Sequence, residues 1–142
     1  MEGKLIRSAF DVLDNSYAPY SGFNVAAAVL TDTGKIYSGV NVENASYPAG
    51  ICAECNAVSN MVSCGEKHIK AIAIVSRDTK AQDGKECGYT SPCGICRQVL
   101  REFSDPEELK VIMAKSETDY KVTTLEELLP ESFGPDSLEA GN

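Results

Sequence analysis

Apolar residues return along this chain with two different periods, and the change of period predicts its secondary structure. Between Glu2 and Ser16, apolar side chains fall at helical spacing, which is typical of an amphipathic helix that ends before Pro19. Segments 23–31 and 35–41 are runs of apolar and β-branched residues, and they flank a tight turn at 32–34. This arrangement predicts a β-hairpin directly after the first helix.

After the hairpin, helical and strand-like segments alternate. We expect a helix over 52–64, a buried strand over 69–76, a polar loop over 77–90, a helix from Ser91 to about Phe103, and a strand over 109–114. Ser91 followed by Pro92 is typical of a capped helix start. A short strand near Tyr120 precedes a capping-box sequence that begins at Thr124. This order predicts an α/β fold, a three-layer α/β/α sandwich with a mixed β-sheet of about five strands.

Length, composition and charge narrow the classes of function. The 142 residues suit a single domain over 1–142. The longest apolar stretch, Val25 to Leu30, is far too short to cross a bilayer. Lys and Arg number 13 and Asp and Glu number 21, so the net charge is −8, which opposes binding to a nucleic-acid backbone or an anionic membrane surface. We therefore expect a small-molecule ligand and, because the N-terminal sequence carries no export signal, a cytoplasmic location.

Six cysteines carry the strongest chemical signal: Cys52, Cys55, Cys64, Cys87, Cys93 and Cys96. In a reducing compartment, they favour metal binding or catalysis over a disulfide framework. Four of them form two C-x-x-C pairs, each at the beginning of a predicted helix. A helix N-terminus lowers the pKa of a thiol, and zinc accepts thiolates in tetrahedral geometry, so the two helix starts predict a zinc site. We expect Cys64 to be a small core residue and Cys87 an exposed loop thiol.

Two kinds of zinc site fit these pairs. A closed structural site would use all four cysteines, and its zinc would do no chemistry. An open catalytic site would use Cys52, Cys93 and Cys96 and leave the fourth position to water, with Glu54 as the carboxylate that takes a proton from that water. The pattern C-x-E…P-C-x-x-C has the glutamate and the proline of zinc nucleobase deaminases. Since this combination is far less common than a single C-x-x-C, we favour the catalytic site.

Beyond the zinc motifs, the chain resembles the small homotetrameric cytidine deaminases over nearly its whole length. The matching segments, in order, are 18–25, 41–47, 91–99 and 128–135. The resemblance implies zinc-dependent hydrolytic deamination of cytidine and 2′-deoxycytidine, a step of pyrimidine salvage. It also implies one zinc per subunit and a homotetramer whose active sites are shared between subunits.

The resemblance further implies a role for each matching residue. Cys52, Cys93 and Cys96 would bind zinc, and Glu54 would move protons. The expected substrate contacts are Asn41 and Glu43 with the ribose, Phe23 with the pyrimidine, the Ala53 backbone with the base carbonyl, the Ser91 carbonyl with the leaving amine, and Tyr47 and Phe133 in the pocket of a neighbouring subunit.

One position departs from the family pattern. Many members have arginine directly after the catalytic glutamate, where this chain has Cys55. Three thiolates leave a net negative charge on a zinc site, which raises the pKa of the bound water, and the family's arginine offsets this charge by bonding to the thiolates. We hypothesise that the two helix N-termini and Arg97 compensate here.

Three other functions use parts of the same pattern. A deaminase of a cytosine-containing antibiotic such as blasticidin S would share the zinc motifs, but the Asn41–Glu43 and Phe133 segments disfavour it. A polynucleotide editor is disfavoured by the charge of −8. A non-catalytic four-cysteine zinc module would lose its metal in Cys55→Ala, whereas an open site would keep it.

Overall fold

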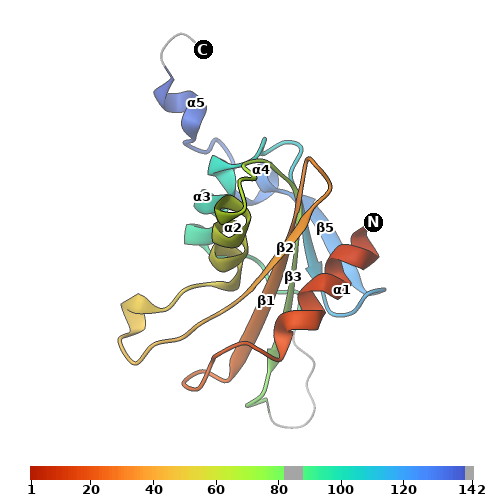
Figure 1. Ribbon diagram of the computed structural model, residues 1–142, viewed down its shortest axis with the longest axis vertical. Coiled ribbons are helices and arrows are strands. Elements are labelled where there is room, and N and C mark those ends of the chain that lie inside the picture. Colours follow the sequence, from red (N-terminus) through yellow and green to blue (C-terminus); the bar gives the residue numbers. More distant parts are fainter. Residues whose placement is uncertain (82–87, 140–142) are drawn as a thin grey trace.

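A five-stranded mixed sheet forms the centre of the computed structural model, which describes residues 1–81 and 88–139 (Figure 1). The strand order is β2-β1-β3-β4-β5, with bounds Ile36–Val40, Phe23–Thr31, Ile69–Asp78, Lys110–Ala114 and Tyr120–Thr124. β3 and β4 are parallel, and the other neighbouring pairs are antiparallel. The expected α/β fold is confirmed.

Helices cover both faces of this sheet. Their bounds are α1 Glu2–Leu13, the 3-10 turn η1 Tyr47–Ala49, α2 Ala53–Ser63, α3 Gly94–Glu102, α4 Leu125–Leu128 and α5 Pro135–Leu138. α1 packs on one face, against β1 residues such as Ala26 and Ala28, whereas α2 packs on the other, against Ala27 and Val29, and α3 adds Leu100 to the same core. Because side chains alternate along a strand, β1 supplies both cores. In the described part of the chain, no helix combines the length and apolarity needed to cross a membrane.

Gly39 of β2 lets α2 approach the sheet closely. A Cβ atom at Gly39 would lie 2.3 Å from the backbone nitrogen of Ala57 and 2.8 Å from the carbonyl oxygen of Ala53. Only glycine therefore fits here without moving the helix. The Asn56 side chain adds a hydrogen bond of 2.8 Å to the Val40 carbonyl. These contacts hold the first turn of α2, and hence the residues that begin it, against the sheet.

The start of α3 differs from the predicted one. The helix begins at Gly94 with Cys93 as its N-cap, so the expected cap at Ser91 is wrong. The Ser91 hydroxyl instead accepts a hydrogen bond of 2.9 Å from the Arg97 guanidinium. A charged donor from the first turn of the helix thus occupies the oxygen that a helix cap would need.

Two further expectations need correction. β3 continues to Asp78, so Arg77 and Asp78 are strand residues and not the beginning of a loop. Cys64 is the exposed C-cap of α2 and not a core residue. The prediction for Cys87 concerns a residue outside the described ranges.

Candidate active site

The two helix starts bring three thiols together. Cys52 is the N-cap of α2, Cys93 is the N-cap of α3, and Cys96 lies in the first turn of α3. Their sulfur atoms all lie within 4.8 Å of one another, with Sγ–Sγ distances of 3.7 Å from Cys52 to Cys93 and 3.6 Å from Cys93 to Cys96. Within residues 1–81 and 88–139, this is the one group of three or more Cys, His, Asp or Glu side chains spaced to hold a metal ion.

The sulfur spacing fits zinc. Tetrahedral zinc with bonds of about 2.3 Å to sulfur sets its ligands about 3.8 Å apart, close to the observed 3.6 and 3.7 Å. The Cys55 sulfur lies 3.7 Å from that of Cys96 but does not belong to the group of three. The geometry therefore favours the open three-cysteine site over the closed four-cysteine one.

The three thiols differ in their tendency to ionise. Burial raises the pKa of Cys52 to about 11. Burial also raises the pKa of Cys96, and the nearby Glu54 carboxylate raises it further. The pKa of Cys93 is lowered on balance, because desolvation, which raises it, is outweighed by hydrogen bonds led by the Cys96 backbone N–H. Three thiolates this close repel one another, so a bound cation is what allows the whole cluster to ionise.

Glu54 is buried beside this cluster. Its exposed fraction is 5%, and burial raises the pKa of its carboxyl group against the opposing effect of the neighbouring Cys96 thiol. A carboxyl group with a raised pKa is suited to accept and release a proton near neutral pH. Ala53, expected to bind the base carbonyl through its backbone, is the buried first residue of α2.

A cavity of about 460 Å³ opens beside the cluster. It is lined by Tyr20, Ser21, Asn41, Val42, Glu43, Asn44, Tyr47, Gly50, Ile51 and Cys52. Four of the residues predicted for the site, Asn41, Glu43, Tyr47 and Cys52, therefore share one cavity. Apolar side chains with a few hydrogen-bonding groups among them are typical of a small-molecule site.

Asn41 is held by the first strand. Its Oδ1 accepts a hydrogen bond of 2.9 Å from the Val25 N–H and also meets the Ser16 hydroxyl, and its Nδ2 donates over 2.9 Å to the Phe23 carbonyl. Phe23, expected against the pyrimidine, is the half-buried first residue of β1. The amide of Asn41 thus links the segment predicted to bind the ribose to the strand that carries Phe23.

Glu43 is held by Tyr20 and Ser21, which precede β1 and also line the cavity. Its carboxylate accepts hydrogen bonds from the backbone N–H groups of Tyr20 (3.0 Å) and Ser21 (3.1 Å) and from the Ser21 hydroxyl (2.5 Å). These bonds, led by that of the Ser21 hydroxyl, lower the pKa of Glu43. The carboxylate therefore stays charged at neutral pH, as an acceptor for ligand hydroxyls must.

Ser91 lies just before α3, and Arg97 folds back onto it. The guanidinium donates to the Ser91 hydroxyl (2.9 Å), the Pro92 carbonyl (2.8 Å) and the Leu128 carbonyl (2.6 Å). These acceptors are oxygen atoms, so Arg97 does not compensate the thiolates through a hydrogen bond to sulfur. Two side chains outside the cluster contact the predicted ligand Cys96, namely Cys55 through its sulfur and Glu54 through its carboxyl group.

Comparison with known proteins identifies the family to which the chain belongs. A family model described as the cytidine and deoxycytidylate deaminase zinc-binding region matches residues 1–113. The chain belongs to this family. In the described part of this zinc-binding region, the three-cysteine cluster could hold one metal ion.

Individual deaminases of the family are similar over most of their length. The cytidine deaminase of Sporosarcina psychrophila is 39% identical over 135 residues, which cover 95% of this chain and 93% of that protein. That of Mycobacterium tuberculosis H37Rv is 41% identical over 125 residues, covering 87% and 82%. The crystal structure of cytidine deaminase from Burkholderia pseudomallei superposes with a TM-score of 0.81 at 38% identity, covering 94% of this chain and 99% of that one.

Two aromatic residues of this deaminase domain are strongly exposed. Tyr47 is 77% exposed and Phe133 is 60% exposed. Tyr47 begins η1, and its ring centroid lies 6.1 Å from that of Tyr20. The Phe133 carbonyl accepts a hydrogen bond of 2.9 Å from the Gln98 side chain, so the C-terminal segment runs along α3. Phe133 does not line the cavity of its own chain.

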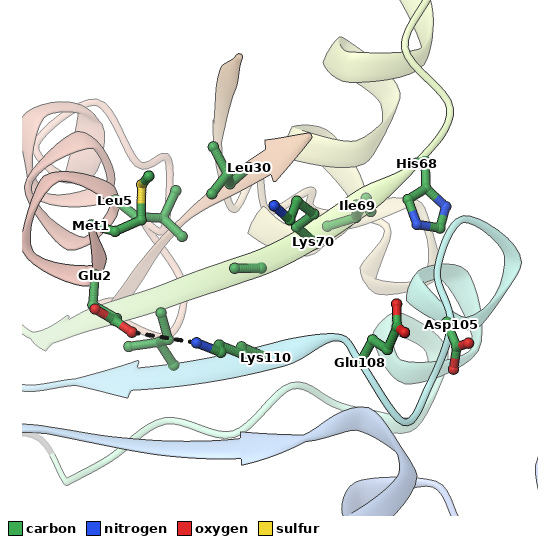
Figure 2. Close-up of a pocket in the computed structure, with 12 residues that line it drawn as sticks. Met1, Glu2, Leu5, Leu30, His68, Ile69, Lys70, Asp105, Glu108 and Lys110 are labelled. Atoms are coloured by element: carbon green, nitrogen blue, oxygen red, sulfur yellow. Dashed lines mark ion pairs between the residues drawn. The ribbon is translucent and has the colours of Figure 1, made fainter. Parts of the chain in front are cut away.

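A second cavity, of about 220 Å³, lies between α1 and the beginnings of β3 and β4 (Figure 2). Leu5, Leu30 and Ile112 give it apolar walls, and an ion pair of 3.7 Å joins Glu2 to Lys110 at its rim. It contains none of the residues that the deaminase motifs predict. The candidate functional site of this deaminase domain is therefore the cavity beside the cysteine cluster.

Sequence reasoning missed two residues that shape this deaminase site. Gly39 seats the helix that carries Glu54, and a glycine inside a predicted strand was the signal for a close backbone approach. Ser21 fixes Glu43 from 22 positions away. No local pattern indicates this contact, because it depends on the fold.

Proposed function

We propose that this chain catalyses the hydrolytic deamination of cytidine and 2′-deoxycytidine to uridine and 2′-deoxyuridine, with release of ammonia. The observation that carries the proposal is a three-thiol cluster with the buried Glu54 carboxyl beside it, facing a nucleoside-sized cavity through Cys52. Membership of the zinc-binding deaminase family and the similarity to cytidine deaminases over most of the chain support the same reaction.

In this proposal, Cys52, Cys93 and Cys96 hold one zinc per subunit. When bound, zinc supplies a Lewis acid that lowers the pKa of a water ligand to about 7. Glu54 takes the proton from the attacking water and delivers it to ring N3, which makes C4 electrophilic. The water oxygen bonds to C4, and Glu54 takes the remaining proton of that oxygen and gives it to the amino group. The C4–N bond then breaks, ammonia leaves, and C4 becomes the carbonyl of uridine. Its raised pKa suits a group that must be both base and acid.

The remaining predicted residues bind the nucleoside. Asn41 and Glu43 bind the ribose hydroxyls, and their rigid positions favour a substrate that offers those hydroxyls. Phe23 packs against the pyrimidine. The Ala53 backbone binds the base carbonyl, and the Ser91 carbonyl accepts a hydrogen bond from the leaving amine.

We also propose that the single domain over 1–142 forms a cytoplasmic homotetramer with shared active sites. Tyr47 and Phe133 are large, exposed aromatic side chains that would contribute to a neighbouring pocket. Sedimentation equilibrium tests this assembly directly. A monomeric mass would remove the shared-pocket roles of both residues.

The first experiment measures uridine formation from cytidine by the zinc-loaded protein and by Glu54→Gln. We expect kcat to fall by about 10²- to 10⁴-fold in Glu54→Gln, because the proton carrier is lost, while the zinc content stays the same. Glu66→Gln is the matched control, since Glu66 lies after α2 and pairs with Lys35 (3.3 Å), and it should keep full turnover. A zinc-loaded parent protein without turnover would contradict the proposed function.

A further inference from the structure

Arg97 connects three parts of the chain next to the zinc-binding cysteines. From the first turn of α3, its Nε donates to the Pro92 carbonyl (2.8 Å) and its Nη2 to the Ser91 hydroxyl (2.9 Å). Its Nη1 donates to the carbonyl of Leu128, the last residue of α4 (2.6 Å). The Arg97 guanidinium therefore joins the residues just before α3 to the end of α4.

Two of these acceptors are backbone carbonyls that helix geometry leaves without partners. The backbone bonds of α3 begin at the Cys93 carbonyl, which accepts from the Arg97 N–H over 3.0 Å. The carbonyl of the buried Pro92 therefore lies outside the helix and depends on the guanidinium for its hydrogen bond. The Leu128 carbonyl is likewise one of the last four of its helix, which have no intrahelical donor.

The same contacts fix the orientation of the Ser91 carbonyl. This carbonyl lies between the two groups that the guanidinium holds, the Ser91 hydroxyl and the Pro92 carbonyl. Among the described residues, no donor reaches the Ser91 carbonyl oxygen itself. Because Ser91 is exposed, this oxygen is a hydrogen-bond acceptor that a ligand N–H group can use.

We propose that Arg97 is a positioning residue for the deamination, which directs the Ser91 carbonyl toward the amino group that leaves as ammonia. This inference rests on the proposed function, because it is the amine of cytidine that the carbonyl would meet. Arg97 acts through Ser91 and Pro92 and does not itself touch the substrate. Its planar fork holds several acceptors in fixed directions, which the single ammonium group of lysine does not reproduce.

The test compares Arg97→Gln and Arg97→Lys with the parent protein in three measurements. These are kcat and KM for cytidine, zinc per subunit, and the inhibition constant of pyrimidin-2-one riboside, the analogue with hydrogen in place of the amine. Since misplacement by about 1 Å can cost about 100-fold, we expect kcat to fall about 10- to 100-fold in Arg97→Gln and less in Arg97→Lys. Zinc content and the inhibition constant should stay close to those of the parent, because neither depends on the amine, and KM should change less than kcat.

Arg101→Gln is the matched control for folding. Arg101 lies one turn further along α3 and bonds instead to the Ser132 hydroxyl (2.8 Å) and to Asp136 (2.6 Å). The Arg101→Gln variant should have a lower Tm and an unchanged kcat. If the C-terminal segment moves, the change should appear in KM.

Three results would overturn the positioning role. They are an unchanged kcat in Arg97→Gln, loss of zinc from that variant, and an inhibition constant that rises in step with the fall in kcat. A parent protein that forms no uridine would overturn the proposed function and this inference with it. An active parent with unaffected Arg97 variants would overturn this inference alone.

Discussion

The two C-x-x-C pairs share one spacing and one place at the start of a helix, yet they contribute differently to the site. In α3, both Cys93 and Cys96 belong to the three-sulfur group. In α2, only Cys52 does, and Cys55 contacts Cys96 from outside the group. The comparison teaches that the spacing brings thiols to a helix start, while the packing of the helix decides which of them face the metal.

The residues between the cysteines show the same difference. Between Cys93 and Cys96, Gly94 and Ile95 are both exposed, and Ile95 is 70% exposed. Between Cys52 and Cys55, Ala53 and Glu54 are both buried. Close packing of α2 on β2 turns Glu54 inward, so that in the proposed site this helix supplies one ligand and the proton carrier, whereas α3 supplies two ligands.

The largest effect that would test this comparison is loss of zinc. Removal of one ligand thiol in Cys52→Ala, Cys93→Ala or Cys96→Ala should weaken zinc binding by more than about 100-fold, because groups outside the first ligand sphere already cost about 10- to 100-fold. Cys55→Ala should retain one zinc per subunit. Competition with a chromophoric chelator measures all four affinities. Equal losses in the four variants would support the closed four-cysteine site instead.

The next effect concerns ionisation within the cluster after zinc is removed. At pH 8, a thiol with a pKa of about 11, as for Cys52, contains roughly 100-fold less thiolate than one at the ordinary 9.0. Cys93, whose pKa is lowered, should therefore react with iodoacetamide first. Cys96, whose pKa is raised by burial, should react last. As the pH rises, the rate at Cys93 should level off before the rate at Cys52 does.

Peptide mass spectrometry of the zinc-free protein gives the rates at each cysteine, with the exposed Cys64 as an internal reference for accessibility. If Cys52 and Cys93 reacted with the same pH profile, the two helix starts would not differ electrostatically.

The sequence predicted what depends on local chemistry and missed what depends on packing. The clustering of Cys52, Cys93 and Cys96 follows from residue type and spacing, and the run of apolar and β-branched residues predicted β1 with its observed bounds, Phe23–Thr31. The Ser91 cap was wrong because a side chain six residues away, that of Arg97, competes for the same oxygen. Cys64 was assigned to the core because the helical pattern continues to it, although it is the exposed C-cap of α2.

A smaller effect on stability and zinc affinity tests whether close packing at Gly39 fixes the position of α2 relative to α3. Gly39→Ala places a methyl group against the α2 backbone, and overpacking of this kind costs about 1–3 kcal/mol of the free energy of unfolding. Because α2 must shift relative to α3, zinc affinity should fall as well. Differential scanning calorimetry and the chelator competition measure both quantities.

Gly3→Ala is the matched control for that change. Gly3 lies in α1, and a Cβ atom there would meet nothing within 4 Å. Alanine should therefore stabilise the helix by up to about 1 kcal/mol and leave zinc affinity unchanged. If Gly39→Ala behaved like Gly3→Ala, close packing would not be what sets α2 in place.

The smallest effect separates two accounts of Cys55 itself. Its sulfur lies 3.7 Å from that of Cys96, so an S–H donor at this position can draw charge from a ligand thiolate and lower the pKa of the zinc-bound water. Cys55→Ala should then shift the pH of half-maximal turnover upward and lower kcat at neutral pH by less than about 10-fold, since one weak hydrogen bond contributes about 0.5–1.5 kcal/mol.

Cys55→Ser, which keeps a donor, should restore part of the parent profile, and Cys64→Ala should match the parent. A profile that does not move in Cys55→Ala would mean that Cys55 only fills space beside the site, and that the charge of three thiolates is balanced by the helix N-termini alone.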